Sequence, residues 1–278
     1  MRRRPDYLAH VILLFGVLIF IFPIWLMFAG ATQDAGAINR GDISLLPRLS
    51  HLGVFMRALT YNGGVKGGVP VWHMLLISLA MALAIAAGKI VISLLSAFAV
   101  SFFRFPFRQV AFWIIFITLM LPVEVRIIPT YSVMASLHLV NSFTGLTMPL
   151  IASATATLLF RQVFVAVPDE LVEAAKMDGA GPMRFLVDIL IPVTSANLAA
   201  LFVILFVYGW NQYLWPLLVA TDPRYQTVIL GIVQMIGVDQ LIQWNMVMAT
   251  TCLAILPPVL VVVLMQRWFV KGLAETDK

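Results

Sequence analysis

Charge is scarce in this sequence. Only 11% of its 278 residues are Asp, Glu, Lys or Arg, whereas soluble domains carry about 25%. Hydrophobic residues make up 62% of the chain, and its mean hydropathy is +0.98. This composition excludes soluble domains and indicates an integral membrane protein. The apolar residues form long continuous runs, so we expect an all-α membrane fold, because a lipid-exposed backbone must satisfy its own hydrogen bonds.

Residues that build catalytic and metal sites are also few. The single cysteine, Cys252, lies in an apolar run, which excludes a disulfide framework and a cysteine-based metal site. The four histidines lack metal-ligand spacing, and neither a G-x-x-x-x-G-K-[ST] phosphate loop nor a G-x-S-x-G nucleophile elbow occurs. We therefore expect no metal, no bound cofactor and no enzyme activity on this chain.

Six apolar stretches are long enough to cross a bilayer, which takes about 20 residues. They lie at roughly 8–29, 72–103, 110–133, 143–166, 197–220 and 245–266. The third and fourth are interrupted by Pro122, Glu124, Arg126, Pro129 and Pro149. We expect one transmembrane domain over 1–278, with an outer loop at 30–71 and a cytoplasmic loop at 161–196. The first apolar region, 11–29, is longer than a signal-peptide core, which predicts an uncleaved anchor.

Basic residues set the predicted orientation. Arg2, Arg3 and Arg4 precede the first span and place the N-terminus in the cytoplasm. The other cytoplasmic segments then hold Arg104, Arg108, Arg161, Lys176, Arg184, Arg267, Lys271 and Lys278. The outer segments hold only Arg40, Arg48, Arg57, Lys66 and Arg224. We therefore attribute the net charge of +5 to the basic residues that orient the chain in a bacterial inner membrane, with both termini cytoplasmic. It is not interpreted as a sign of nucleic-acid binding.

The cytoplasmic loop contains the segment PDELVEAAKMDGAGPMRFLVDILIP at 168–192. Pro168 and the acidic residues after it favour a helix over 168–177, with Leu171, Ala174 and Ala175 on one side. Gly179 is placed to end that helix as a left-handed cap. A second short helix is expected over about 182–190. By these features alone, an ordinary capped surface helix is an equally good interpretation.

The spacing in this loop resembles the EAA signature of ATP-binding-cassette importer permeases, E-A-A-x3-G-x9-I-x-L-P. The matching positions are Glu173, Ala174, Ala175, Gly179, Ile189 and Pro192, and Ile191 stands where the family usually has Leu. The segments FRFPFR (103–108), FITLMLPVEVRIIPT (116–130), SATATLLFRQ (153–162), YGWNQYLWPLL (208–218) and VKGL (270–273) are similar to the second membrane subunit of sugar-type importers of this family.

The resemblance implies a type I importer permease core. It further implies a heterodimer with a sister permease, two copies of an ATPase that binds ATP and Mg²⁺, a periplasmic substrate-binding protein, and surrounding lipid. The ATPase would dock on Glu173, Ala174, Ala175, Asp178, Gly179, Ala180, Ile189 and Pro192. The implied substrate is sn-glycerol-3-phosphate or a related glycerophosphodiester. A neutral sugar or oligosaccharide is the alternative substrate, and an ion-coupled secondary transporter is the rival class.

A few polar residues lie inside the predicted spans, where ionisable groups usually face a cavity or a partner. Helix depth suggests an ion pair between Lys89 and Glu124; the alternative is that each faces water or the sister subunit. Arg126 is a candidate for attracting an anionic substrate, or it reaches the outer interface or the sister subunit. Asn211, Gln212 and Tyr213 either belong to an aromatic interface belt or line the path. Ala80, Ala84 and Gly88 predict close helix packing.

Overall fold

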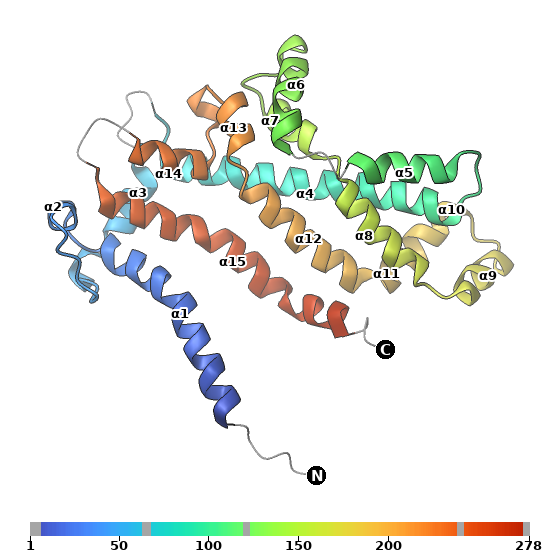
Figure 1. Cartoon of the computed structure of the whole chain (residues 1–278), viewed down its shortest axis with the longest axis horizontal. Coiled ribbons are helices and arrows are strands. Elements are labelled where there is room, and N and C mark those ends of the chain that lie inside the picture. Colours follow the sequence, from blue (N-terminus) through green and yellow to red (C-terminus); the bar gives the residue numbers. More distant parts are fainter. Residues whose placement is uncertain (1–6, 63–67, 119–122, 238–241, 275–278) are drawn as a thin grey trace. The chain divides into compact units, whose positions relative to one another are not determined.

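The computed structural model describes residues 7–62, 68–118, 123–237 and 242–274, and for 123–124 and 268–274 it describes the backbone only. Every regular element within these ranges is helical (Figure 1). The chain divides into two compact units, the first within 1–75 and 227–256 and the second within 76–226 and 257–278. Two of the three boundaries between these units, at 75/76 and 256/257, fall inside long helices, and the third, at 226/227, falls between helices.

The first unit holds the N-terminal helix and the outer loop. Its elements are α1 (Tyr7–Ala31), α2 (Ala35–Asn39), η1 (Leu49–His51), α3 (Val54–Thr60), the start of α4 (Val71–Phe102), α14 (Val228–Ile236) and most of the first half of α15 (Trp244–Ala274). Buried Val54, Ala58 and Ala249 pack with Ala31 at the end of α1. Most of α1 before Trp25 is exposed, as Phe20 with 80% of its surface exposed illustrates.

The second unit holds the remaining elements. They are most of α4, α5 (Arg108–Thr118), α6 (Val123–Ser136), α7 (Phe143–Thr147), η2 (Met148–Leu150), α8 (Ala154–Val165), α9 (Asp169–Met177), α10 (Pro182–Arg184), η3 (Phe185–Leu190), α11 (Ile191–Val193), α12 (Ser195–Trp210), α13 (Leu214–Val219), η4 (Pro223–Tyr225) and the end of α15. One core cluster joins α4, α8, η3 and α12 through Phe98, Phe160, Leu190 and Leu201.

The predicted spans match the helices unevenly. Helices α1, α4 and α15 are long and apolar enough to cross a membrane. The predicted fourth span is a bent pair, 143–150 and 154–165, whose axes differ by 48°. The fifth is preceded by the helical segment 182–193, which meets α12 at 81°. Counting each bent pair as one span gives up to five, and in the third predicted span residues 119–122 lie outside the described chain.

The fifth predicted span, 197–220, is also not one helix. Helix α12 ends at Trp210, and α13 begins only at Leu214. The intervening residues are three polar ones, Asn211, Gln212 and Tyr213, which interrupt the apolar run. An irregular backbone at membrane depth is tolerated where it is buried in protein or lines a cavity.

The outer loop contains short helices that sequence periodicity did not indicate. Asp34 caps α2, because its carboxylate accepts hydrogen bonds from the backbone N–H groups of Gly36 and Ala37 at 3.0 and 3.3 Å. The Gln33 side chain bridges two segments, donating to the Ser44 carbonyl at 2.5 Å and accepting from the Ser44 N–H at 2.9 Å. These side-chain bonds order a loop that is too short in each part to show a helical period.

Candidate functional site

Helix α9 forms the first part of the cytoplasmic loop and has the end structure that the sequence predicts. It begins at Asp169, directly after Pro168. Beyond its end, Gly179 has a φ of +69°. The Ala180 N–H donates to the Ala175 carbonyl at 2.9 Å and the Gly179 N–H to the Lys176 carbonyl at 3.1 Å, which are the two bonds of a Schellman cap. The predicted left-handed cap at Gly179 is confirmed.

The two alanines of the signature face opposite environments. Ala175 is 4% exposed and packs with Val172 and Ala180 into the core beneath α9. Ala174 is exposed, as are Glu173 and Asp178. The spacing placed Leu171, Ala174 and Ala175 on one side of the helix, but Ala174 and Ala175 are about 100° apart around its axis, and only Ala175 reaches the core. The result is a helix with one face fixed to its own protein and the other open.

The second part of the loop continues as one helical segment through α10, η3 and α11. Its middle, Phe185–Leu190, is a π-helical stretch, which widens the helix by one residue. Phe185, Leu186 and Leu190 are buried, whereas Pro192 is exposed and Ile189 is half-buried. An ion pair, Arg184–Asp188 at 3.4 Å, lies on the exposed face of this helical segment. The predicted helix over about 182–190 is confirmed.

Aromatic side chains connect this loop to the end of α4. The Phe102 ring lies edge-on to Phe185, with 5.3 Å between the ring centres, and it also contacts Phe164 of α8. A cavity of about 380 Å³ lies here, lined by Phe98, Phe102, Phe103, Arg104, Val172, Ala175, Lys176, Ala180, Pro182 and Phe185. Residues of α9 and residues at the end of α4 therefore border the same cavity.

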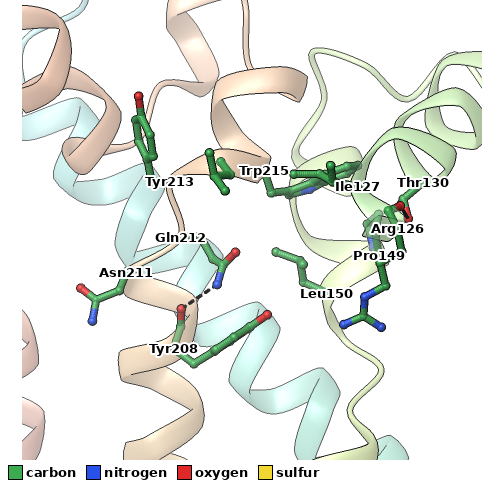
Figure 2. A pocket seen from close by; sticks show the side chains of 11 residues that line it. Arg126, Ile127, Thr130, Pro149, Leu150, Tyr208, Asn211, Gln212, Tyr213 and Trp215 are labelled. Carbon is green, nitrogen blue, oxygen red and sulfur yellow. Dashed lines mark hydrogen bonds between the residues drawn. The ribbon is translucent and has the colours of Figure 1, made fainter. Parts of the chain in front are cut away.

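A second cavity, of about 330 Å³, lies farther along the same unit. It is lined by Arg126, Ile127, Thr130, Pro149, Leu150, Tyr208, Asn211, Gln212, Tyr213, Leu214 and Trp215. It therefore brings together Arg126 and the three polar residues at 211–213, which the sequence had singled out separately. Figure 2 shows Arg126 and Tyr208 extending toward each other, with Gln212 between Tyr208 and Trp215. Asn211 and Tyr213 extend away from Arg126 in the same view.

Packing behind the cavity fixes its walls. Buried Trp215 and Val219 of α13 pack against Met134 of α6, the helix that carries Arg126. The Trp215 indole N–H donates to the Gly145 carbonyl at 3.1 Å, which ties α13 to α7. Arg126 and the 211–213 turn are therefore held on neighbouring, mutually packed helices.

Lys89 lies beside this cavity rather than in an ion pair with a described residue. It is 5% exposed, and its ammonium nitrogen lies 3.5 Å from the centre of the Tyr208 ring. Such a cation–π contact stabilises a desolvated cation by about 2 kcal/mol. Close helix packing produces it: a side-chain carbon at Gly209 would lie 3.0 Å from the Ala82 Cα, so α12 approaches α4 closely enough to bring Tyr208 over Lys89.

Two other predictions at this site have mixed outcomes. The side chain of Glu124 lies outside the described residues, so the Lys89–Glu124 ion pair stays a prediction. The prediction of close helix packing at Ala80, Ala84 and Gly88 is only partly right. Gly88 packs closely against Ile151, but Ala80 is exposed, and the closest approach of α12 uses Ala82 instead.

The contact of Tyr208 with Lys89 is the feature of this cavity that the sequence did not predict. Tyr208 lies 119 positions from Lys89, and no local pattern indicates that its ring covers a lysine. Its only sequence signal is membership of the polar and aromatic run at 208–215. Across the described residues, no three His, Cys, Asp or Glu side chains are grouped as a metal site requires.

Comparison with protein families and curated proteins gives consistent matches. Residues 89–275 match the family described as "Binding-protein-dependent transport system inner membrane component". The chain is 56% identical to the sn-glycerol-3-phosphate transport system permease protein UgpE of Agrobacterium fabrum, over 98% of this chain and 96% of the relative. It is 53% identical to the UgpE protein of Pectobacterium atrosepticum, over 100% of this chain and 99% of the relative.

A solved structure supports the fold. The chain superposes with a TM-score of 0.81 on a chain from the crystal structure of a bacterial ABC transporter involved in the import of the acidic polysaccharide alginate. The match covers 97% of this chain and 99% of that one, at 21% sequence identity. At this identity the likeness concerns the backbone arrangement alone, and it agrees with the expected importer permease fold.

Proposed function

Because this chain belongs to the family of binding-protein-dependent transport system inner membrane components, we propose that it is the permease subunit of an ATP-driven importer of sn-glycerol-3-phosphate or related glycerophosphodiesters. The observation that carries the substrate is the identity of 56% to a permease named for sn-glycerol-3-phosphate, over nearly the full length of both chains. The chain provides part of the path, and substrate crosses by alternating access.

In this proposal the chain crosses the membrane six times, with both termini in the cytoplasm. Helices α1, α4 and α15, the bent pair 143–150 and 154–165, and α12 with α13 make five crossings, and α5 with α6 makes the remaining one. The excess of basic residues in the predicted cytoplasmic segments supports this orientation. It places α9 and α10 on the cytoplasmic side.

The proposed assembly contains a sister permease, two ATPase subunits and a periplasmic binding protein. ATP and Mg²⁺ bind to the ATPase, and this chain hydrolyses nothing itself. The open face of α9, with Glu173, Ala174 and Asp178, docks on the ATPase. Nucleotide-driven closure of the ATPase pair then moves the membrane helices as rigid bodies. The fixed face of α9, anchored by Ala175, carries that movement into α4 and α8.

Uptake by proteoliposomes tests this function. The complete transporter, supplied with its binding protein and internal ATP, should accumulate labelled sn-glycerol-3-phosphate, and a neutral sugar should not compete. Glu173→Gln should lower uptake several-fold while the ATPase continues to hydrolyse ATP. Glu170→Gln, another acid exposed on α9, is the matched control and should transport normally. ATP-independent uptake by the isolated chain, driven by an ion gradient, would instead identify a secondary transporter.

A further inference from the structure

We propose that the cavity around Arg126 receives the phosphoryl group of the transported substrate, with Arg126 as its direct ligand and Lys89 as a second positive charge behind Tyr208. The inference rests on the proposed function, and it adds a charge-selective subsite to the translocation path. Its basis is the juxtaposition of two cations, a polar turn and a cavity in one packed group of helices.

Arg126 has the chemistry for direct contact. Its guanidinium extends into the cavity and presents a planar fork of donors that matches two phosphate oxygens. None of the ion pairs between described side chains involves Arg126. The described lining residues include no carboxylate that would repel an anion, with the Glu124 side chain outside the described set.

Lys89 adds positive charge that the described residues leave unneutralised. A buried ammonium is costly unless it is paired, and its described contact is the face of a neutral ring. The charge of Arg126 is near enough to act on Lys89, and the two positive groups repel. An anion bound between Arg126 and the Tyr208 wall would relieve that repulsion and attract both.

Neutral groups of the cavity suit the remainder of a glycerophosphate. The Gln212 amide donates to the Tyr208 carbonyl at 3.1 Å, which fixes its orientation and leaves its carbonyl oxygen to accept from a substrate hydroxyl. Thr130 and the Tyr208 hydroxyl provide further polar contacts. A volume of about 330 Å³ is at the lower end of small-molecule sites, typically about 300–1,000 Å³, and suits a compact ligand.

The test compares two substrates of different charge in the complete reconstituted transporter. Near neutral pH a phosphate monoester carries about −1.5 to −2 charges, whereas the phosphate of a glycerophosphodiester carries only about −1. We therefore measure kcat/KM for uptake of sn-glycerol-3-phosphate and of glycerophosphoglycerol, and take their ratio. The binding protein is the same in every assay, so its own preference cancels between variants.

Arg126→Gln should lower kcat/KM for the monoester at least ten-fold and the monoester-to-diester ratio at least three-fold. Arg126→Lys, which keeps the charge without the fork, should recover part of the ratio. Lys89→Met should lower the ratio in the same direction. Arg224→Gln removes an arginine that is instead paired with Asp222 at 2.7 Å, and it should leave the ratio unchanged.

An equal loss for both substrates in Arg126→Gln and Arg126→Lys would mean a merely structural role and would overturn this inference. So would an unchanged ratio in Arg126→Gln when the wild-type complex transports sn-glycerol-3-phosphate, and in that case the proposed function would stand. A wild-type complex that fails to transport either substrate would overturn the proposed function itself.

Discussion

At the scale of single residues, Gly179 is the position where the signature depends on backbone conformation. With φ at +69°, an L side chain is strained by roughly 1–2 kcal/mol, and nothing lies within 4 Å of where a Cβ would be. Gly179→Ala should therefore loosen the cap without any clash. We expect about ten-fold faster hydrogen–deuterium exchange at 178–180.

Gly181 provides the control for that prediction. It also has open space around its Cα, but its φ is −67°, which alanine adopts freely. Gly181→Ala should leave exchange at 178–180 unchanged. If both variants loosened the loop equally, the left-handed conformation would not be what makes Gly179 necessary.

Asp222 gives a pH-dependent prediction in the loop after α13. The Arg224 side chain hydrogen-bonds to its carboxylate and lowers the pKa of Asp222 below the ordinary value of 3.8. Because the pKa is lowered in the folded state, the stabilisation by the Asp222–Arg224 ion pair is fully present above pH 3.8. It is lost as the pH falls through the folded-state pKa. The Arg224 backbone N–H donates to the same carboxylate at 2.9 Å. The exchange rate of this amide hydrogen therefore reports whether the ion pair is formed.

We therefore expect the Arg224 amide to exchange more slowly in wild type than in Asp222→Asn at pH 6. The difference should disappear as the pH falls well below 3.8, because the protonated carboxyl no longer attracts the guanidinium. A difference that stayed constant across this range would show that the local fold, and not the charge, protects the amide.

At the scale of elements, the opposite environments of Ala174 and Ala175 separate folding from docking. Ala175→Leu inserts a larger side chain into the packed face of α9 and should destabilise the chain by about 1–3 kcal/mol. Ala174→Leu changes only the open face, so the thermal stability of the purified chain should be unaffected. The amount of ATPase that copurifies should nevertheless fall. Full ATPase recovery with Ala174→Leu would remove this face from the docking surface.

The helices that sequence could predict are those whose signal is local. Long apolar runs located α1, α4 and α15, and spacing located the helix and cap around Gly179. The outer-loop helices were missed because α2 and α3 span only 5 and 7 residues, too few to show a period. The break after Trp210 was missed because the apolar residues on both sides read as one continuous span.

The candidate site was predictable only in part for a related reason. Arg126 and Gln212 stand out singly, because polar groups are unusual in apolar runs. Their meeting in one cavity depends on the packing of α6 against α13 around Trp215. The Lys89–Tyr208 contact likewise depends on the close approach at Gly209, which no spacing rule contains.

At the scale of the whole molecule, the single cysteine allows a direct test of topology. With Cys252 replaced by alanine, one new cysteine can be placed at Met56, which is 71% exposed, or at Phe107, which is 79% exposed. A membrane-impermeant maleimide should label Met56→Cys in intact spheroplasts and Phe107→Cys only in inside-out vesicles. Labelling of both from one side would contradict the proposed crossing by α4.

The continuity of α4 has a thermodynamic consequence. This one helix carries Lys89 beside the cavity and Phe102 beside the loop, 13 residues or about 20 Å apart. If ATPase docking alters the cavity's affinity for substrate by some factor, linkage requires that a bound substrate alter the affinity for the ATPase by the same factor. The substrate and the ATPase would then each be an allosteric effector of the other. Saturating substrate should therefore shift the dissociation constant of the ATPase for the permease even without nucleotide.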